Sequence, residues 1–470
     1  MKKRVLSLLL VALITASLLV GCGGSNGGSG GSSSGGGPSA ATAAPSDEPE
    51  GKIINIYSWN TEFQYRLEAV YDKVDHTSDD GTITYLTDGA EIHWIINPNT
   101  DGVYQNKLDE ALLRQSSAAT DEKVDMFLSE TDYVVKYTDA DVNVAIPLTT
   151  LGIDPATDLK DQYDFTKVVA SDANGVQRGS TWQGCPCLLV YRRDIANDVF
   201  GTDDPDEIAA ICGDWSKMKD AAAQLKAKGY FTFASYADTF RSYGNSISAP
   251  WVTGTTLTVD PRIMEWVSDS KEWLDAGYFD KTIKGQWNDD WNRSMSSKSK
   301  VFAFMFPAWG IDFVLTPNWD GAAGSWGVTT GPQSFNWGGS FIHGCVGTDN
   351  REHVKEIILA MTANADNMTK ITREFTEFTN NRPVMNSFAT DESFGTDFLG
   401  GENPFKYFGP AAEGIQMTTL SPYDQGCVEL IQNAFGDYLQ GLVDFDKAKS
   451  NFEIAIKERY PDLTEIVWPS

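Results

Sequence analysis

Aromatic and planar polar side chains occur together where the sequence predicts strand ends and loops. Trp59, Asn60 and Glu62 follow the first predicted strand, and Glu130 follows a later one. The other candidates are Trp182, Tyr236, Asp238, Arg241, Trp251, Trp287, Trp309, Trp337, Gly338, Gly339 and Arg382. A flat indole can cover the C–H face of a sugar ring, while carboxylate, amide and guanidinium groups can hold its hydroxyls at fixed positions. The pattern therefore indicates a binding site for a small molecule of this kind.

These residues also have structural interpretations. A tryptophan is more often packed in a core than exposed to a ligand, and core packing is expected for Trp94, Trp215, Trp266 and Trp273, which lie inside predicted elements. The positions at element ends, where a ligand platform is favoured, are Trp59, Trp182, Trp309 and Trp337. Glu62 could belong to a first helical turn, Glu130 could cap a helix, and Arg382 could form a salt bridge. Gly338 and Gly339 permit either a close backbone approach to a ligand or a turn.

Composition and motifs exclude several other functions. With 65 acidic and 37 basic residues, the net charge of −28 opposes nucleic-acid binding, which needs a basic surface. Outside the Gly- and Ser-rich segment 22–50, the sequence lacks the Gly-x-Ser-x-Gly nucleophile elbow, and it lacks the phosphate-binding Gly-x-x-x-x-Gly-Lys loop. It has four histidines and no Cys-x-x-Cys pair, so no metal site and no cofactor are predicted. Five cysteines follow Cys22, so at least one is unpaired or pairs between chains.

The elements that must position the candidates alternate between strands and helices. Short β-rich runs lie at 53–57, 91–96 and 124–128, and helical patterns at 62–74 and 104–114 lie between them. This alternation predicts an α/β fold with a parallel sheet covered by helices. Later segments include predicted helices at 215–228 and 446–459 and a buried strand at 301–306.

The N-terminus has the pattern of a secretion signal. Met1-Lys2-Lys3-Arg4 precedes an apolar run at 5–20, which is shorter than the roughly 20 residues of a spanning helix. Leu19-Val20-Gly21-Cys22-Gly23 resembles a bacterial lipobox, which implies a signal peptide at 1–21 and a lipid on Cys22. The alternative is ordinary signal cleavage nearby with a free cysteine. Residues 22–50 are rich in Gly and Ser and are predicted to be a disordered tether.

Ordered landmarks along the chain resemble one known family. They lie at 54–60, 124–130, 146–153, 191–194, 200–205, 337–339 and 348–350. The chain resembles the extracellular solute-binding proteins of carbohydrate ABC transporters, the maltose-binding-protein-like family 1. The resemblance implies a two-lobed periplasmic-binding-protein-like fold whose ligand cleft lies between lobes joined by crossing strands. Lobe one would comprise 51–182 and 338–385, and lobe two would comprise 183–337 and 386–470.

The resemblance also implies a function. The chain would be a monomeric, non-enzymatic substrate-binding component that captures a mono- or oligosaccharide and delivers it to ABC permease subunits. It would act outside the cytoplasm, anchored to the bacterial membrane by the lipid on Cys22. Two alternatives stay open. A secreted, tethered glycoside hydrolase also uses tryptophan platforms and paired carboxylates, and an aromatic site can hold a quaternary ammonium or polyamine ligand.

Overall fold

The computed structural model of the protein describes residues 50–469. The predicted signal peptide, Cys22 and the predicted tether up to residue 49 lie outside the described residues and stay predictions. Within residues 50–469, no helix combines the length and the apolar character that crossing a membrane requires.

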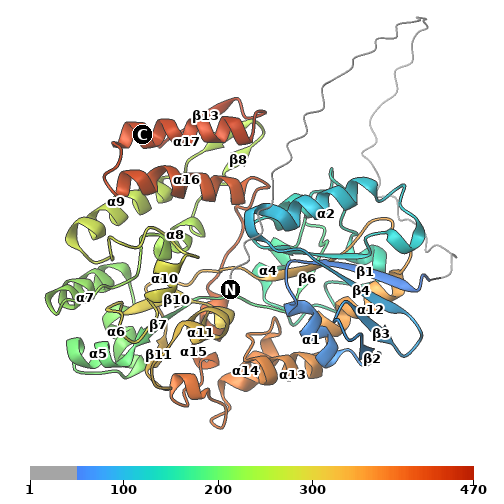
Figure 1. The fold of residues 1–470 in the computed structure, drawn as a ribbon, viewed down its shortest axis with the longest axis horizontal. Helices are drawn as coiled ribbons and strands as arrows, with labels where there is room; N and C mark the ends of the chain where they lie inside the picture. Colours follow the sequence, from blue (N-terminus) through green and yellow to red (C-terminus); the bar gives the residue numbers. More distant parts are fainter. Residues whose placement is uncertain (1–49, 470) are drawn as a thin grey trace, which may run out of the picture. The chain divides into compact units, whose positions relative to one another are not determined.

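The first part of the fold is a seven-stranded sheet with the order β2-β3-β4-β1-β5-β12-β6 (Figure 1). Its strands are β1 (Ile53–Ser58), β2 (Val74–Thr77), β3 (Ile83–Leu86), β4 (Glu91–Ile96), β5 (Met126–Glu130), β6 (Ser180–Thr181) and β12 (Ser340–Gly344). β1 is parallel to β4 and β5, whereas β12 is antiparallel to β5 and β6, and β3 is antiparallel to β2 and β4. The sheet is therefore mixed, and the expectation of a parallel sheet was right only for its centre.

Helices cover both faces of this sheet, as the alternation of strands and helices predicts. They are α1 (Glu62–Val70), α2 (Val103–Arg114), α3 (Val134–Thr138), α4 (Asp164–Val169), α12 (Arg351–Thr362) and α13 (Ala365–Phe375). Along β5, Met126 and Leu128 join the main core with Phe63 of α1, whereas Phe127 joins a second core cluster with Tyr104 of α2. Alternate side chains of one strand thus enter different cores, as expected for a sheet buried on both faces. We call this part lobe one.

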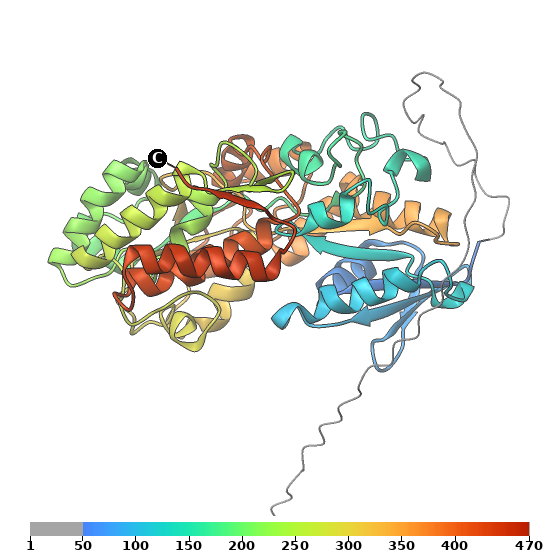
Figure 2. The same ribbon diagram turned by 90° about the horizontal axis from the view of Figure 1, so that it is seen from above.

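The second part, lobe two, carries two three-stranded sheets. One has the order β10-β7-β11 and the other the order β13-β9-β8, with strands β7 (Leu188–Arg192), β8 (Val252–Thr253), β9 (Thr256–Thr258), β10 (Ala303–Phe306), β11 (Trp326–Thr329) and β13 (Glu465–Val467). The helices around them are α5 (Arg193–Phe200), α6 (Pro205–Cys212), α7 (Trp215–Ala227), α8 (Ala237–Gly244), α9 (Pro261–Ala276), α10 (Asp289–Arg293), α11 (Thr316–Asn318), α14 (Arg382–Ala389), α15 (Phe405–Glu413), α16 (Asp424–Leu439) and α17 (Phe445–Arg459). The last two long helices, α16 and α17, lie side by side (Figure 1), and Figure 2 shows the same end of the chain from above.

Short helical turns complete the two lobes. They are 3₁₀ turns at Thr100–Gly102, Thr120–Glu122, Leu148–Leu151 and Asp397–Leu399, and a π-helical turn at Gly310–Leu315. Local signals explain the ends of the longer helices. Asp260 caps α9 by accepting a hydrogen bond from the Arg262 amide, and Gly277 ends this helix in the left-handed conformation with φ of 77°.

Three chain segments connect the lobes. The Gly184 amide donates to the Phe378 carbonyl, and the Trp337 amide donates to the Cys185 carbonyl. The isolated bridges between Gln183 and Thr379, and between Pro186 and Asn336, bring the same segments together. The chain therefore passes between lobes three times and has the predicted two-lobed α/β architecture. The five cysteines of the described part, Cys185, Cys187, Cys212, Cys345 and Cys427, are all buried thiols.

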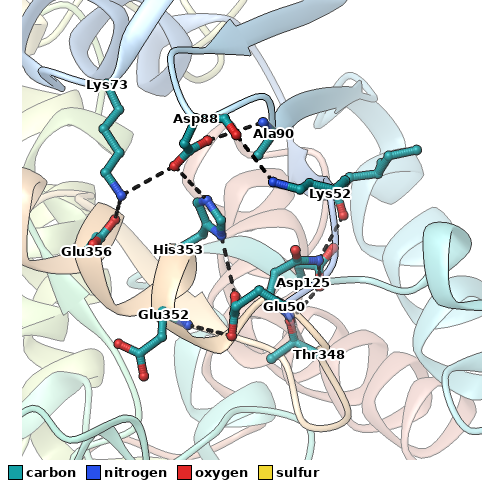
Figure 3. A network of polar contacts seen from close by, with 12 residues as sticks. Glu50, Lys52, Lys73, Asp88, Ala90, Asp125, Thr348, Glu352, His353 and Glu356 are labelled. Atoms are coloured by element: carbon teal, nitrogen blue, oxygen red, sulfur yellow. Dashed lines mark hydrogen bonds and ion pairs between the residues drawn. The ribbon is translucent and has the colours of Figure 1, made fainter. Parts of the chain in front are cut away.

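The described chain begins against lobe one (Figure 3). The Glu50 carboxylate accepts a hydrogen bond from the Glu352 amide in the first turn of α12, and it lies 3.4 Å from a ring nitrogen of His353. The other ring nitrogen of His353 lies 3.2 Å from Asp88, which also pairs with Lys73 at 3.4 Å. A carboxylate at a helix N-terminus is favoured by the free amides there. These contacts hold the start of the described chain against lobe one.

Candidate functional site

A cavity of about 370 Å³ lies between the two lobes. Lobe one contributes Trp59, Asn60, Glu62, Asn99, Glu130 and Asp132. Lobe two contributes Arg241, Trp287, Trp309 and Phe313, and the crossing segments contribute Gln183, Trp337, Gly338, Gly339 and Ser340. Ten of the fifteen ligand-binding candidates from the sequence are among these residues: Trp59, Asn60, Glu62, Glu130, Arg241, Trp287, Trp309, Trp337, Gly338 and Gly339.

The lobe-one side of the cavity is built at the carboxyl ends of neighbouring parallel strands. Asn60 follows β1, and its side-chain oxygen accepts a hydrogen bond from the Glu62 amide at 3.0 Å, which shapes the turn into α1. Glu130 ends β5, and its carboxylate accepts a hydrogen bond from the Asp132 amide at 2.9 Å. Because β1 and β5 are parallel neighbours, the loops after them open on the same edge of the sheet.

The lobe-two side is a wall of three indoles. The ring centroids of Trp309 and Trp337 are 5.5 Å apart and edge to face, and those of Trp287 and Trp309 are 6.4 Å apart and nearly parallel. The Trp309 indole donates to the Trp337 carbonyl at 3.2 Å, and Phe306 supports Trp337 from behind with centroids 5.9 Å apart. The rings are therefore held in place before any ligand arrives.

Two acidic side chains in the cavity have raised pKa values. Burial and the neighbouring Asp132 raise the pKa of Glu130 to about 8, although Arg241 opposes this shift. Burial and the nearby Glu377 also raise the pKa of Glu62. Burial disfavours the charged form of each carboxyl, so a hydrogen-bond donor that enters the cavity would stabilise the charged form.

One ion pair crosses the cavity from lobe to lobe. Two nitrogens of Arg241 on α8 donate to the two carboxylate oxygens of Asp132, after β5, at 2.7 and 2.6 Å. Arg241 also lies over the Trp337 ring at 5.4 Å. This two-pronged geometry is the strong form of a carboxylate–guanidinium contact, so it holds the lobes in the arrangement that forms the cavity.

Gln183 occupies the floor of the cavity on the first crossing segment. Its amide nitrogen donates to Glu62 at 2.9 Å and to Glu377 at 3.2 Å, and its oxygen accepts from the Ser340 amide at 3.0 Å. One side chain therefore connects the cavity carboxylate to both other crossing segments.

Three of the remaining candidates are buried within the lobes. Trp182 is fully buried and stacks on Phe63 with centroids 5.3 Å apart, because the neighbouring Gln183 takes the cavity side of this extended segment. Asp238 accepts hydrogen bonds from Gln286 at 2.9 Å and Trp291 at 2.8 Å, and burial raises its pKa to about 6. Trp251 is 3% exposed, and it lines a different cavity, of 60 Å³.

The other two candidates also lie outside the cavity. Tyr236 donates its hydroxyl to the Lys284 carbonyl at 2.7 Å and lines an adjoining groove rather than the cavity. Arg382 opens α14 and pairs with Glu413 at 2.6 Å, so it makes the salt bridge that was its structural alternative. None of these five residues lines the cavity between the lobes.

Five cavity residues were missed in the sequence. Asp132, Gln183 and Ser340 lie within two positions of predicted candidates, so wider windows around strand ends would have included them. Phe313 follows Trp309 by four positions, a helical spacing that places both on one face, but the π-helical turn after Trp309 had no recognised signal. Asn99 lies in the loop after β4 and follows Pro98.

Comparison with known proteins places the chain in a family. The family model for bacterial extracellular solute-binding proteins matches residues 98–398. The chain belongs to this family. A search of curated proteins gives no match. The predicted membership of the solute-binding proteins is thus confirmed, whereas the lipid anchor stays a prediction.

Solved structures with the same fold cover nearly the whole described chain. An extracellular solute-binding protein of family 1 has a TM-score of 0.69 at 18% identity, over 88% of this chain and 100% of the other. The ABC transporter associated binding protein from B. animalis subsp. lactis, in complex with β-1,6-galactobiose, has a TM-score of 0.63 at 17% identity, over 88% and 99%. The sugar-binding protein MalE from Xanthomonas citri has a TM-score of 0.62 at 14% identity, over 87% and 98%. At these identities the likeness concerns the fold.

Proposed function

We propose that this solute-binding protein is the substrate-binding component of an ABC uptake transporter and that it captures a mono- or oligosaccharide. The observation that carries the proposal is the cavity between the lobes, where three indoles face the carboxyls of Glu62 and Glu130. Indoles cover the apolar faces of sugar rings, while carboxylates and the Arg241 guanidinium bind hydroxyls. The neighbours crystallised with or described as binding sugars support the same ligand class.

The loaded protein would deliver its ligand to membrane permease subunits. The lipobox resemblance at Leu19-Val20-Gly21-Cys22 supports a mature form that is anchored outside the cytoplasm by lipid on Cys22. Growth with radioactive palmitate tests the anchor. We expect label on the wild-type chain and none on a Cys22→Ser variant, and label on both chains would contradict the anchor.

A second ligand class has one specific observation in its favour. Trp287, Trp309 and Trp337 could surround a quaternary ammonium or polyamine group through cation–π attraction, and the carboxyls of Glu62 and Glu130 would add charge. Both ligand classes keep the same site and the same transport role.

The test is thermal melting and tryptophan fluorescence of the protein with neutral mono- and oligosaccharides, glycine betaine and spermidine, with each mixture analysed for products. A ligand that binds only the folded state raises the melting temperature by mass action. We expect one saccharide to do so without product formation. A response to betaine or spermidine alone would contradict a sugar as the ligand. Turnover of a glycan would contradict the transport role and favour a glycoside hydrolase.

A matched pair of variants locates the ligand. Trp309→Ala removes a ring of the cavity wall, whereas Trp319→Ala removes an indole of lobe two that does not line the cavity. Since a stacked ring contributes on the order of 1 kcal/mol beyond buried area, we expect about a tenfold loss of affinity for Trp309→Ala. We expect wild-type affinity for Trp319→Ala. Equal affinities of the two variants would place the ligand elsewhere.

A further inference from the structure

A second hollow continues the cavity on the lobe-two side. This groove has a volume of about 570 Å³ and lies between α8, α16 and the loop 284–288. Asp132, Arg241 and Trp287 line both the groove and the cavity, so the two spaces meet at these residues. Anything that leaves the cavity past Trp287 enters the groove.

Carboxamides dominate the groove. Six of them line it, namely Gln286, Asn288, Gln425, Gln432, Asn433 and Gln440, and we call it the amide groove. Four of the chain's thirteen glutamines lie here. The chain has far more charged residues than amide residues, so a groove that was only solvated would be expected to carry mostly charged side chains. The concentration of neutral donors and acceptors therefore calls for a specific explanation.

One helix face supplies three of these six groups. Gln425, Gln432 and Asn433 on α16 are seven and eight positions apart, a spacing that returns them to the same side of the helix. Within the described residues, the side-chain amides of Gln425 and Asn433 make no hydrogen bond to protein, and Gln432 reaches only the Val428 carbonyl of its own helix, at 3.4 Å. These amides are free to bind a guest.

Trp287 lies at the junction in an unusual conformation. Its φ is +63°, a left-handed value that side chains larger than glycine rarely adopt, and its surface is 60% exposed. The flanking side chains hold it there, because Gln286 donates to Asp238 and the Asn288 oxygen accepts from the Trp291 amide in α10. A strained backbone that presents an exposed indole points to a function for the ring.

We infer that the amide groove binds the outer units of an oligosaccharide whose inner units occupy the cavity, with Trp287 stacking on the ring that passes between them. This inference rests on the proposed function and narrows its ligand from any sugar to a neutral chain longer than the cavity holds. Amides suit such a guest because each offers a donor and an acceptor to neighbouring hydroxyls.

The charges of the groove favour a neutral glycan over an acidic one. Lys284 and Arg241 are its basic groups, whereas Asp132, Glu429 and Asp437 are its acidic groups. Arg241 is paired with Asp132, and Glu429 is paired with Arg459, so within residues 50–469 an acidic chain would find Lys284 as the one basic group of the groove lining that is not in such a pair. A peptide would need apolar or backbone partners along the groove, and α16 offers amides instead.

The test compares ligand length with the loss of amides from α16. The affinities of wild-type protein and Gln425→Ala/Gln432→Ala are measured by calorimetry for neutral gluco-, galacto-, xylo- and manno-oligosaccharides of one to six units. Gln224→Ala, which removes an exposed glutamine of α7 outside the groove, is the control. Equal melting temperatures of the three proteins without ligand establish that the substitutions leave the fold intact.

We expect the affinity of the wild-type protein to rise with chain length beyond the disaccharide. The double variant should bind the longest ligand about tenfold more weakly, since each lost hydrogen bond has a modest net effect, and should bind the shortest ligand unchanged. The proposal for the amide groove alone would be overturned by either of two results. One is a wild-type affinity that does not change with chain length, and the other is equal affinities of the double variant and the control for long chains. Failure of every glycan to bind wild-type protein would overturn the sugar proposal with it.

Discussion

Replacing Asp132 by Asn removes the acidic side of the ion pair that joins the lobes. The Asp132 and Arg241 side chains are 27% and 23% exposed, so the ion pair is neither fully exposed nor fully buried. A fully exposed ion pair contributes about 0.2–1 kcal/mol, and a hydrogen bond to a charged group contributes about 1.5–3 kcal/mol. With its two short hydrogen bonds, this pair should stabilise the arrangement of the lobes that forms the cavity by about 1.5 kcal/mol, or roughly tenfold in ligand affinity.

The assay is a double-mutant cycle on the affinity for whichever saccharide binds best. Wild type, Asp132→Asn, Arg241→Gln and the double variant are titrated by calorimetry. Because each single variant also changes a group that lines the cavity, only the coupling energy isolates the contact between the lobes. We expect a coupling energy of about 1–2 kcal/mol that decreases at high salt.

A matched control separates this contact from ordinary surface charge. Glu272→Gln removes the ion pair with Lys219, 2.7 Å long, which lies within lobe two and outside the cavity. It should leave the affinity unchanged. A coupling energy below about 0.3 kcal/mol for Asp132 and Arg241 would be indistinguishable from additivity and would refute their role in holding the lobes together.

Three further predictions concern protonation and packing. Ligand hydroxyls that donate to Glu62 and Glu130 would lower the raised pKa values of these carboxyls, so binding should release protons. The affinity should therefore fall as the pH falls from about 8 towards 6. Calorimetry in buffers of different ionisation enthalpy measures the proton release. Burial lowers the pKa of His343 to about 4, below its unfolded value of 6.5. Between these pH values the unfolded state binds a proton that the folded state does not. The free energy of unfolding should therefore rise by about 3 kcal/mol from pH 4 to 6.5. Denaturant titrations should show a shallower pH slope for His343→Gln, and an unchanged slope would contradict this. Trp182→Ala should cost about 3–5 kcal/mol of stability, whereas Trp309→Ala should mainly reduce affinity; melting and titration of both variants test the contrast.

The positions best predicted from the sequence are those at strand ends. Trp59, Asn60, Glu62 and Glu130 follow β1 and β5, and the parallel pairing of these strands brings their loops together whatever the rest of the chain does. The alternating pattern that predicted an α/β layer is likewise local. The antiparallel strand β12 was not predicted, because it returns to β5 only after the excursion through lobe two.

Side-chain direction limited the prediction elsewhere. Trp182 and Gln183 are neighbours on an extended segment, so one faces the core and the other the cavity, and composition favoured the wrong one. On α8, Asp238 and Arg241 are three positions apart, but Asp238 is held by Trp291 within lobe two, whereas Arg241 reaches Asp132 in lobe one. The partner that decides each direction is more than fifty residues away in sequence, so a local pattern could not identify it.

Similar long-range contacts connect the ligand cavity to the segments that join the lobes. Gln183 binds Glu62 in the cavity, Glu377 on the third crossing segment and the Ser340 amide on the second. A hydroxyl that donates to Glu62 stabilises its charged form, which strengthens the hydrogen bond from Gln183. Since that amide also sets the spacing of the three crossing segments, ligand binding and the arrangement of the lobes share one buried polar group. The cavity carboxylate is thus coupled to the other crossing segments through Gln183, and Arg66 adds a second link because it pairs with both Glu62 at 3.5 Å and Glu377 at 3.1 Å.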